Sequence, residues 1–373
     1  MRIGLDAKWL FSGPVSTRTV LENLLPELFE SYEEHEWIIF LDKKDKKFDF
    51  PFTQKNITIQ YVWAESNMLS NVFVLPRYSK KLNTDIMVYQ TFPSFKRSPP
   101  SIAFIHDVLF RDFPQFFTWK EKLYFKALSL LSKKATRLIA TSEFVANDLI
   151  KYDYAKNRTH IDIVPLGVSK QYKLLENHDQ NRVKKIKDKY SLPDEFVLYV
   201  GRLNTRKNIE ALLKALPFLD NKSIPVVIVG KKDWKAPDLK QIVVNTAIEN
   251  RIIFTGSVTT EELVIVYALA KVFCFPSFAE GFGLPPLEAM ASGVPVIVSA
   301  TAAMPEVCGD AAIYIDPCEP HSIVSALNCL LQDDEKYNQM KIKGLKRAAI
   351  FSWEKTAQRF MQSILNAAQQ KPK

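Results

Sequence analysis

Short runs of β-branched and aromatic residues alternate with amphipathic helical stretches along the whole 373-residue chain. In the first half these runs are Arg2–Asp6, Trp37–Leu41, Ile57–Trp63, Ile86–Tyr89, Ile102–Ile105, Leu138–Ala140 and Ile161–Val164. In the second half they are Phe196–Val200, Pro225–Val229, Ile252–Phe254, Val272–Phe275, Val296–Val298 and Ile313–Ile315. Strands that alternate with helices indicate parallel sheets covered on both faces. The sequence therefore predicts an α/β fold.

The segment from Pro165 to Pro193 is polar and has no strand pattern, and it separates the two series of strands. We therefore predict two Rossmann-like domains facing each other, residues 1–170 and 171–351. Ser352 suits the N-cap of a last helix over 352–373, whose apolar face is expected to pack back on the N-terminal domain. Ligands of open α/β sheets bind outside the carboxyl ends of the strands, so site residues are expected directly after strands.

The composition, 47% hydrophobic and 24% charged, is that of a globular protein, and the formal net charge of +9 favours acidic partners. Four cysteines without C-x-x-C spacing indicate a reducing compartment. Arg2, Asp6 and Lys8 interrupt any signal-peptide core, and no apolar stretch approaches the roughly 20 residues that span a bilayer. We therefore expect a cytoplasmic protein.

The strongest functional signal is Phe273–Val298, which reads as strand, loop, helix, turn and strand. Pro285 and Pro286 suit the first turn of the helix, where no amide donor is needed, and Gly293 suits the position that ends it. A glycine-rich loop before a helix N-terminus lets backbone amides approach a phosphate.

Four residues of that loop and helix are candidate ligands. Gly281 and Gly283 stand just before the helix, Glu280 lies in the loop, and Glu288 lies about one turn into the helix. Two glutamates at this spacing, with no other signal around them, would usually be solvated side chains on the surface. The glycines, the double proline and the strand context favour a site instead.

The segment Tyr199–Leu216 is the second signal. Arg202 and Lys207 flank a short loop after a strand, and Asn208 can cap the helix that follows. Two cations beside a helix N-terminus can hold a diphosphate, because arginine offers a planar fork and lysine a point charge. A solvated basic turn explains this segment alone equally well.

His106 directly follows the strand Ile102–Ile105. A histidine there can bind a sugar hydroxyl or move a proton. A lone histidine is more often structural, but its place at a strand end in the predicted cleft favours function.

Taken together, these motifs resemble the retaining glycosyltransferases of family 4, which have the GT-B fold. The likeness covers nearly the whole chain. It rests on the start MRIGLDA, HD at 106–107, TSEF at 141–144, VPLGV at 164–168, GR-x4-KN from Gly201, FTGSV at 254–258, E-x7-E from Glu280 and SWEKTA near the end.

The resemblance implies roles for these positions. Glu280 would contact hydroxyls of the donor sugar and Glu288 those of the donor ribose. Arg202 and Lys207 would hold the diphosphate, helped by the amides of Phe282, Gly283 and Leu284. The turn near Val258 would receive the base, and His106 would meet the transferred sugar. The resemblance also implies that Gly13 binds the donor. One departure concerns the turn near Gly13, where Ser16 and Thr17 precede Arg18 in place of the family's G-x-G-R, which tightens the loop and adds hydroxyls.

The resemblance also implies the chemistry. It implies a metal-independent hexosyltransferase, and the sequence contains no D-x-D. GDP-mannose is the favoured donor and UDP-glucose a second candidate, with a glycan or lipid-linked acceptor. The rivals are a GT-B epimerase or phosphorylase and, from the charge alone, a nucleic-acid-binding protein, although no nucleic-acid motif is present.

The segment Trp119–Arg137 is basic and amphipathic, and aromatic residues surround its start. Such a helix can lie on anionic lipid, which would suit a peripheral enzyme on the inner face of the plasma membrane. An ordinary Rossmann helix with a solvated basic face fits the pattern equally well.

Overall fold

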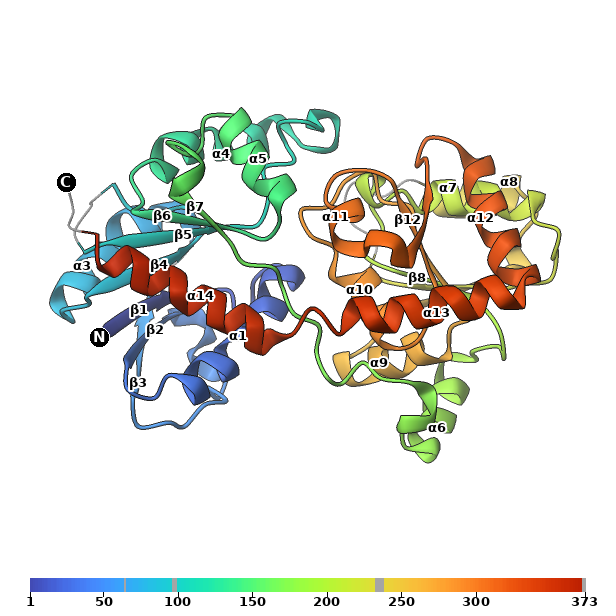
Figure 1. Ribbon diagram of the computed structural model, residues 1–373, viewed down its shortest axis with the longest axis horizontal. Coiled ribbons are helices and arrows are strands. Elements are labelled where there is room, and N and C mark those ends of the chain that lie inside the picture. The colour runs from blue at the N-terminus through green and yellow to red at the C-terminus, as the bar shows by residue number, and fades with distance from the viewer. Residues whose placement is uncertain (64, 96–98, 232–237, 371–373) are drawn as a thin grey trace. The chain divides into compact units, whose positions relative to one another are not determined.

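The structure is a computed structural model that describes residues 1–63, 65–95, 99–231 and 238–370 (Figure 1). The chain divides into two compact units. Unit 1 comprises Met1–Gly167 and Ser352–Lys373, and unit 2 comprises Val168–Phe351.

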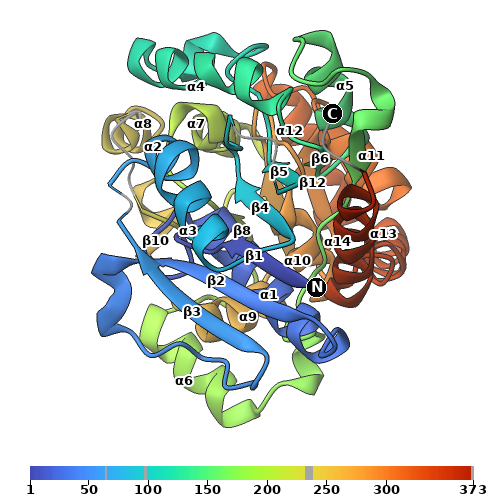
Figure 2. The same ribbon diagram turned by 90° about the vertical axis from the view of Figure 1, so that its left-hand side faces the viewer.

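The described part of unit 1 holds a seven-stranded parallel sheet in the order β3-β2-β1-β4-β5-β6-β7, seen from one end in Figure 2. Its strands are β1 (Arg2–Asp6), β2 (Glu36–Asp42), β3 (Ile57–Val62), β4 (Ile86–Gln90), β5 (Ser101–Ile105), β6 (Arg137–Ala140) and β7 (Ile161–Ile163). Its α-helices are α1 (Val15–Ser31), α2 (Asn67–Leu69), α3 (Leu75–Lys81), α4 (Trp119–Ser132), α5 (Glu143–Lys151) and α14 (Trp353–Ala368).

The C-terminal helix α14 returns to the first sheet, as expected from the sequence. It packs on α1 and on the strands β4, β5 and β6 (Figure 1). The Ser352 hydroxyl caps it by accepting a hydrogen bond from the Lys355 amide at 3.3 Å. Phe360 and Ile364 are buried on the face toward the sheet.

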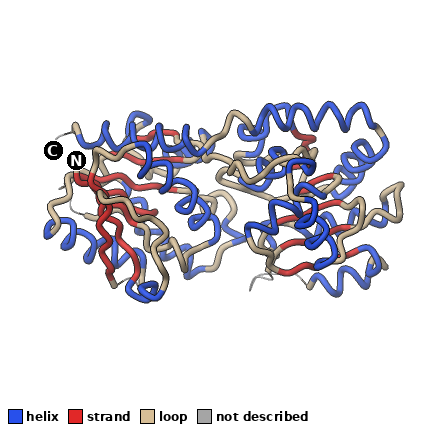
Figure 3. Tube along the Cα trace, turned by 90° about the horizontal axis from the view of Figure 1, so that it is seen from below, coloured by secondary structure: helices blue, strands red, loops and turns tan. Residues whose placement is uncertain are grey.

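The described part of unit 2 holds a six-stranded parallel sheet in the order β10-β9-β8-β11-β12-β13. Its strands are β8 (Val197–Val200), β9 (Val226–Val229), β10 (Ile252–Gly256), β11 (Val272–Phe275), β12 (Val296–Ser299) and β13 (Ala312–Ile315). Its α-helices are α6 (Gln180–Tyr190), α7 (Ile209–Ala215), α8 (Leu239–Asn245), α9 (Thr260–Leu269), α10 (Leu284–Ala291), α11 (Met304–Cys308), α12 (Pro320–Gln332) and α13 (Asp334–Ala348). Within each unit, helices lie on both sides of the strands (Figure 3).

Both sheets have the strand order of a Rossmann fold, which confirms the predicted α/β class. The order reverses between β1 and β4 in unit 1, and between β8 and β11 in unit 2. The strands at these reversals are almost wholly buried, as the near-continuous apolar runs predicted.

Two local details were not predicted from the sequence. The segment Pro165–Pro193 has no strand but contains the helix α6, which Asp179 caps by accepting from the Arg182 amide at 2.8 Å. The amphipathic pattern of the sequence predicts a helix over Thr19–Glu30, but α1 begins four residues earlier, at Val15.

Candidate active site

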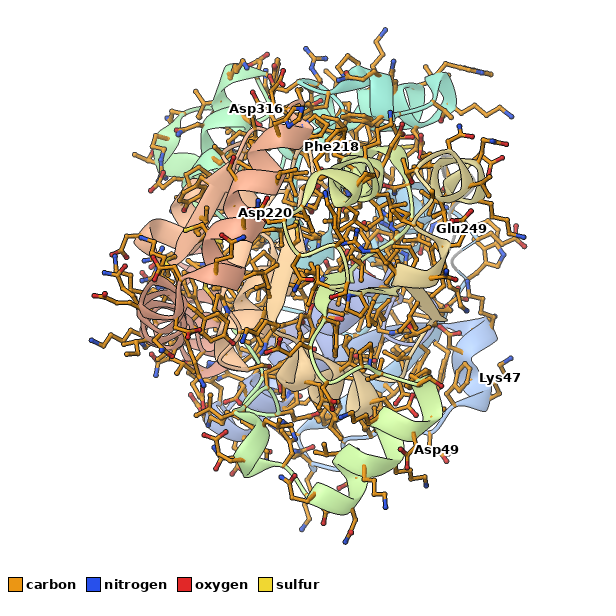
Figure 4. The ribbon with its side chains drawn as sticks, turned by 90° about the vertical axis from the view of Figure 1, so that its right-hand side faces the viewer. Lys47, Asp49, Phe218, Asp220, Glu249 and Asp316 are labelled. Carbon is orange, nitrogen blue, oxygen red and sulfur yellow. The ribbon has the colours of Figure 1, made fainter. Side chains whose placement is uncertain are left out.

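The carboxyl ends of β8 and β11 define the candidate site of unit 2. These strands are neighbours in the sheet although β9 and β10 lie between them in sequence, so they form the point where the strand order reverses. The loop after β8 leads into α7, and the loop after β11 leads into α10. Open α/β sheets bind ligands at this kind of position. Figure 4 labels Phe218 and Glu249, which belong to connections entering the amino ends of β9 and β10 and so lie away from this edge.

The two loops meet in a buried ion-pair cluster around Glu280. The Lys207 ammonium donates to Glu280 Oε1 at 2.7 Å, and the Ser277 hydroxyl donates to the same oxygen at 2.5 Å. The Arg206 guanidinium lies 3.3 Å from this oxygen and also donates to the Ala279 carbonyl. The Lys207 ammonium also lies 4.8 Å from the centre of the Phe275 ring. The structure therefore brings together two predicted site residues, Lys207 and Glu280, in direct contact.

Burial and neighbouring charges shift the pKa values of both Glu280 and Lys207. Burial alone would raise the pKa of Glu280, but the charges of Lys207 and Arg206 and the hydrogen bonds from Lys207 and Ser277 outweigh it and lower the pKa to about 2. Burial lowers the pKa of Lys207 to about 8, against the opposing effect of Glu280. At neutral pH both groups are charged, and the cluster of Lys207, Arg206 and Glu280 carries one net positive charge.

Arg206 is the residue of this cluster that the sequence analysis missed. Its neighbours Arg202 and Lys207 carry the family motif GR-x4-KN, in which position 206 is one of the unspecified residues. Its side chain is 15% exposed and reaches Glu280 from the short helical turn Thr205–Lys207. The arginine next to Lys207 was a usable signal, because a buried carboxylate between strand ends needs compensating charge.

The glycine-rich turn holds the N-terminus of α10 open. Gly283 precedes the helix with φ +103°, and a Cβ atom there would lie 2.2 Å from Met304 Cε. Prolines occupy the first turn, as predicted, and no side chain caps the helix among the described contacts. Leu284 begins α10, Phe282 is buried, and Gly281 lies beside them in the loop. Glycine is therefore required at 283 by both backbone conformation and space.

Glu288 lies in a separate environment from Glu280. It is buried on α10, and Glu288 Oε2 accepts a hydrogen bond from the Tyr267 hydroxyl at 2.9 Å. Tyr172 contributes a second side-chain hydrogen bond. Burial raises the pKa of Glu288 to about 7 although both tyrosines act against the increase. The two glutamates of E-x7-E thus differ in charge near neutral pH, a difference that their spacing alone did not predict.

The raised pKa of Glu288 predicts a pH-dependent stability. The folded protein holds this proton more tightly than the unfolded chain, so the unfolding free energy falls as pH rises from about 4.5 to about 7, by roughly 3 kcal/mol. Glu288→Gln is expected to match the wild type near pH 5 and to be more stable at pH 8. Urea unfolding at pH 5, 6.5 and 8 measures this.

Glu262→Gln is a control of opposite sign. Hydrogen bonds from Lys189 and Tyr190 lower the pKa of Glu262 to about 2. Its stabilisation is present above about pH 4.5 and is lost as pH falls toward 2, so this variant is expected to be less stable at pH 8. Parallel pH profiles of Glu288→Gln and wild type would contradict the assignment for Glu288.

Arg202 and Val258 also belong to unit 2. Arg202 follows β8 with an exposed side chain, and its charge acts on Lys207. Its carbonyl accepts from the Tyr199 hydroxyl at 3.3 Å. Val258 is half-buried between β10 and α9, two strands away from β8.

The predicted cap at Asn208 is wrong. Asn208 precedes α7 with φ +52°, and its side chain makes no capping hydrogen bond. Its side-chain nitrogen Nδ2 instead donates to the Pro317 carbonyl at 2.8 Å. The left-handed backbone turns the side chain away from the amides of α7, and the preceding Asn204 caps the short turn by accepting from the Lys207 amide at 3.1 Å.

Two predicted site residues, His106 and Gly13, belong to unit 1. His106 is half-buried after β5, with Nε2 3.3 Å from Gln90 Oε1, and burial lowers its pKa to about 4. Gly13 lies in the turn before α1, where a Cβ atom would be 2.2 Å from Trp9 Cβ.

Within the described ranges, no group of three or more His, Cys, Asp or Glu side chains is placed to hold a metal ion. In the same ranges no helix is both long and apolar enough to cross a membrane.

Comparison with solved structures shows which class of fold this is. Sucrose-phosphate synthase (tll1590) from Thermosynechococcus elongatus is similar with a TM-score of 0.77 and 19% identity, covering 98% of each chain. This likeness, together with the two Rossmann-type sheets, defines a GT-B fold.

Comparison of sequences shows the family. Residues 19–172 match Glycosyltransferase Family 4, and residues 181–347 match Glycosyl transferases group 1. O-antigen chain mannosyltransferase B of Escherichia coli is 33% identical over 260 residues, 68% of this chain and 67% of that protein. The chain belongs to glycosyltransferase family 4.

A second relative is much longer than the region of likeness. The serotype-specific mannosyltransferase WbdA of Escherichia coli is 34% identical over 234 residues, which are 60% of this chain but 28% of that protein. The chain therefore matches about a quarter of the length of WbdA.

Proposed function

We propose that this protein is a retaining hexosyltransferase that moves mannose from GDP-mannose to a hydroxyl of a glycan or lipid-linked acceptor, in the synthesis of cell-surface polysaccharide or glycolipid. The family and the mannosyltransferase names of its relatives support the reaction class and the sugar. UDP-glucose is the second donor candidate.

The observation that carries the proposal is the buried cluster of Glu280, Lys207 and Arg206 where the strand order of unit 2 reverses. A carboxylate held ionised by two cations can accept hydrogen bonds from sugar hydroxyls. The remaining positive charge and the free N-terminus of α10 suit a diphosphate beside it.

In the proposed reaction, the bond between the anomeric carbon and the β-phosphate oxygen breaks as an acceptor hydroxyl attacks on the same face. The proton of that hydroxyl passes to the departing phosphate. Arg202, Lys207 and the amides at 282–284 stabilise the charge that grows on the phosphate, and His106 contacts the transferred sugar. No divalent metal takes part in this scheme.

A donor panel tests the proposal. GDP-mannose, UDP-glucose and other nucleotide sugars are incubated with the full chain, with and without EDTA, and sugar release and product anomers are analysed. GDP-mannose turnover that persists in EDTA with retained configuration is expected. An inverted product, a trapped glycosyl-enzyme adduct or loss of turnover in EDTA would each contradict part of the scheme. Thermal shift with GDP, UDP and short oligonucleotides separates this function from nucleic-acid binding.

We also propose that helix α4 docks on an anionic membrane surface at the cytoplasmic face. Three large apolar side chains are exposed at helical spacing on α4: Trp119 (69%), Leu123 (61%) and Leu130 (67%). The exposed Lys122 and Lys126 lie between them and line a surface cavity with Trp119 and Leu123. Apolar side chains among cations favour an anionic bilayer surface, where each cation contributes about 1 kcal/mol.

We restrict the proposed membrane surface to part of the predicted region Trp119–Arg137 and its neighbouring aromatic residues. Phe117, Tyr124 and Phe125 pack against the core of unit 1 and do not belong to an exposed aromatic surface. Arg137 lies in β6, where its guanidinium contacts Asp162 at 2.5 Å. The proposed surface is therefore α4 itself, with Trp119, Leu123 and Leu130 as its apolar residues.

Liposome co-sedimentation tests this docking. The protein is expected to pellet with vesicles containing phosphatidylglycerol at low salt, to be released at high salt, and to stay in solution with phosphatidylcholine alone. Leu123→Ser is expected to weaken binding several-fold because the apolar contact is lost. Val244→Ser, which alters a 58% exposed side chain of unit 2, is the matched control. Equal sedimentation of Leu123→Ser and Val244→Ser would contradict the proposal.

A further inference from the structure

A buried polar network lies where the strand order of unit 1 reverses, between β1 and β4. Gln90 is the last residue of β4 and is 2% exposed. Its side-chain oxygen Oε1 lies 3.3 Å from Nε2 of His106, which follows the neighbouring strand β5. The network therefore reaches the one histidine that the proposed reaction uses.

The backbone of Gln90 is fixed on both sides. Its amide donates to Asp6 Oδ2 at 3.3 Å, and its carbonyl accepts from the side-chain amides of Asn67 and Asn71, each at 3.2 Å. The next residue, Thr91, has φ +68°, which a non-glycine residue keeps only when its surroundings hold it there. Such positions concentrate where geometry matters for function.

The Asp6 carboxylate, which accepts from the Gln90 amide, has its negative charge compensated by Lys8 within the same network. The Lys8 ammonium donates to Asp6 Oδ1 at 2.5 Å and to Asn71 Oδ1 at 2.6 Å, and the side chains of Lys8 and Asp6 are 2% and 1% exposed. A π-helical turn, Ser70–Val74, presents Asn71 to these partners. Lys8, Asp6 and Asn71 thus satisfy one another, whereas Asn67 Oδ1 has no hydrogen-bond partner among the described residues. The mutual bonds of the first three side chains stiffen this part of the network.

The contact between Gln90 and His106 has a chemical consequence. An amide oxygen can only accept, so the proton of a neutral imidazole in this contact resides on Nε2. The hydrogen bond made by one ring nitrogen sets the state of the other. Nδ1 is therefore left as an acceptor. The ring is further held by Phe104, whose centroid lies 4.5 Å away.

We infer that Gln90 is a positioning residue that keeps His106 in the Nε2–H tautomer, so that Nδ1 accepts a hydrogen bond from a hydroxyl of the transferred sugar. The sugar contact rests on the proposed function. The tautomer itself does not depend on it.

Nitrogen-15 NMR of the histidine rings tests the tautomer directly. The signals of His106 are assigned with His106→Asn, and spectra of the full chain are recorded at pH 7. We expect a protonated Nε2 and an unprotonated Nδ1. Gln90→Met, which keeps the length but removes the acceptor, is expected to lose this single tautomer. Gln90→Glu keeps an acceptor oxygen and is expected to retain the Nε2–H signal.

Sugar transfer tests the positioning role. Gln90→Met is expected to lower kcat about tenfold, the effect of losing one hydrogen bond, with little change in the donor KM. Gln60→Met, on β3 of the same sheet, is the matched control and is expected to keep wild-type kcat. A wild-type Nδ1–H tautomer, or Gln90→Met with wild-type spectra or wild-type kcat, would overturn the inference. Absence of transfer by the wild type with the expected NMR result would instead count against the proposed function alone.

Discussion

Lys207→Ala is expected to lower kcat about 10²–10³-fold, because it removes one preorganised charge from the place where we propose that negative charge grows on the leaving phosphate. It also removes the 2.7 Å ion pair with Glu280. Arg206 and Ser277 remain against that carboxylate. The loss in unfolding free energy should therefore stay below the roughly 3–5 kcal/mol that follows when a buried charge loses its partner. The variant should fold, and kcat at saturating donor with urea unfolding measures both effects.

Lys214→Ala is the matched control for this variant. Lys214 also pairs with a glutamate at 2.7 Å, but on the surface of α7, where it and Glu210 are 52% and 36% exposed. An exposed pair of this type contributes about 0.3–0.5 kcal/mol, so Lys214→Ala should change neither stability nor turnover appreciably. Full activity of Lys207→Ala would show that the proposed diphosphate clamp is wrong.

The sequence predicted the fold well because its signal is local. Strands such as Val272–Phe275 and Val296–Ser299 are buried on both faces and so appear as uninterrupted apolar runs. The last helix was readable from Ser352 and its apolar face. The start of α1 was not, because Val15–Arg18 show no apolar period and join the helix after a proline N-cap without a side-chain cap.

The candidate site was predictable only in part. Spacing placed Lys207 and Glu280 after strand ends, and the structure brings them into contact. Spacing could not show that Arg206 shares this carboxylate, or that Glu288 faces Tyr267 instead of a cation. These contacts join segments far apart in the chain, and no single-residue pattern records which partner fills a buried site.

Gly283→Ala is expected to weaken donor binding strongly and to destabilise unit 2. The backbone at this position, φ +103°, costs a residue with a Cβ atom about 1–3 kcal/mol. The new methyl group would lie 2.2 Å from Met304 Cε, so the Met304 side chain or the turn must move. Because this turn precedes the first amides of α10, a shift displaces the donors that we propose for the diphosphate. The donor KM should rise at least tenfold, measured together with the unfolding free energy.

Gly309→Ala separates strain from site geometry. Gly309 also has a positive φ, +56°, but the nearest atom to its Cβ position is Arg347 Cζ at an ordinary 3.4 Å, and it lies at the end of α11 outside the proposed site. Its ψ is −135°, a combination that a residue with a Cβ atom rarely adopts, so this control should lose about 1–3 kcal/mol of stability and keep the wild-type donor KM. If Gly283→Ala behaved in the same way, losing stability without a change in KM, the amides at 282–284 would not hold the donor. The anion site would then have to lie with Arg202 and Lys207 alone.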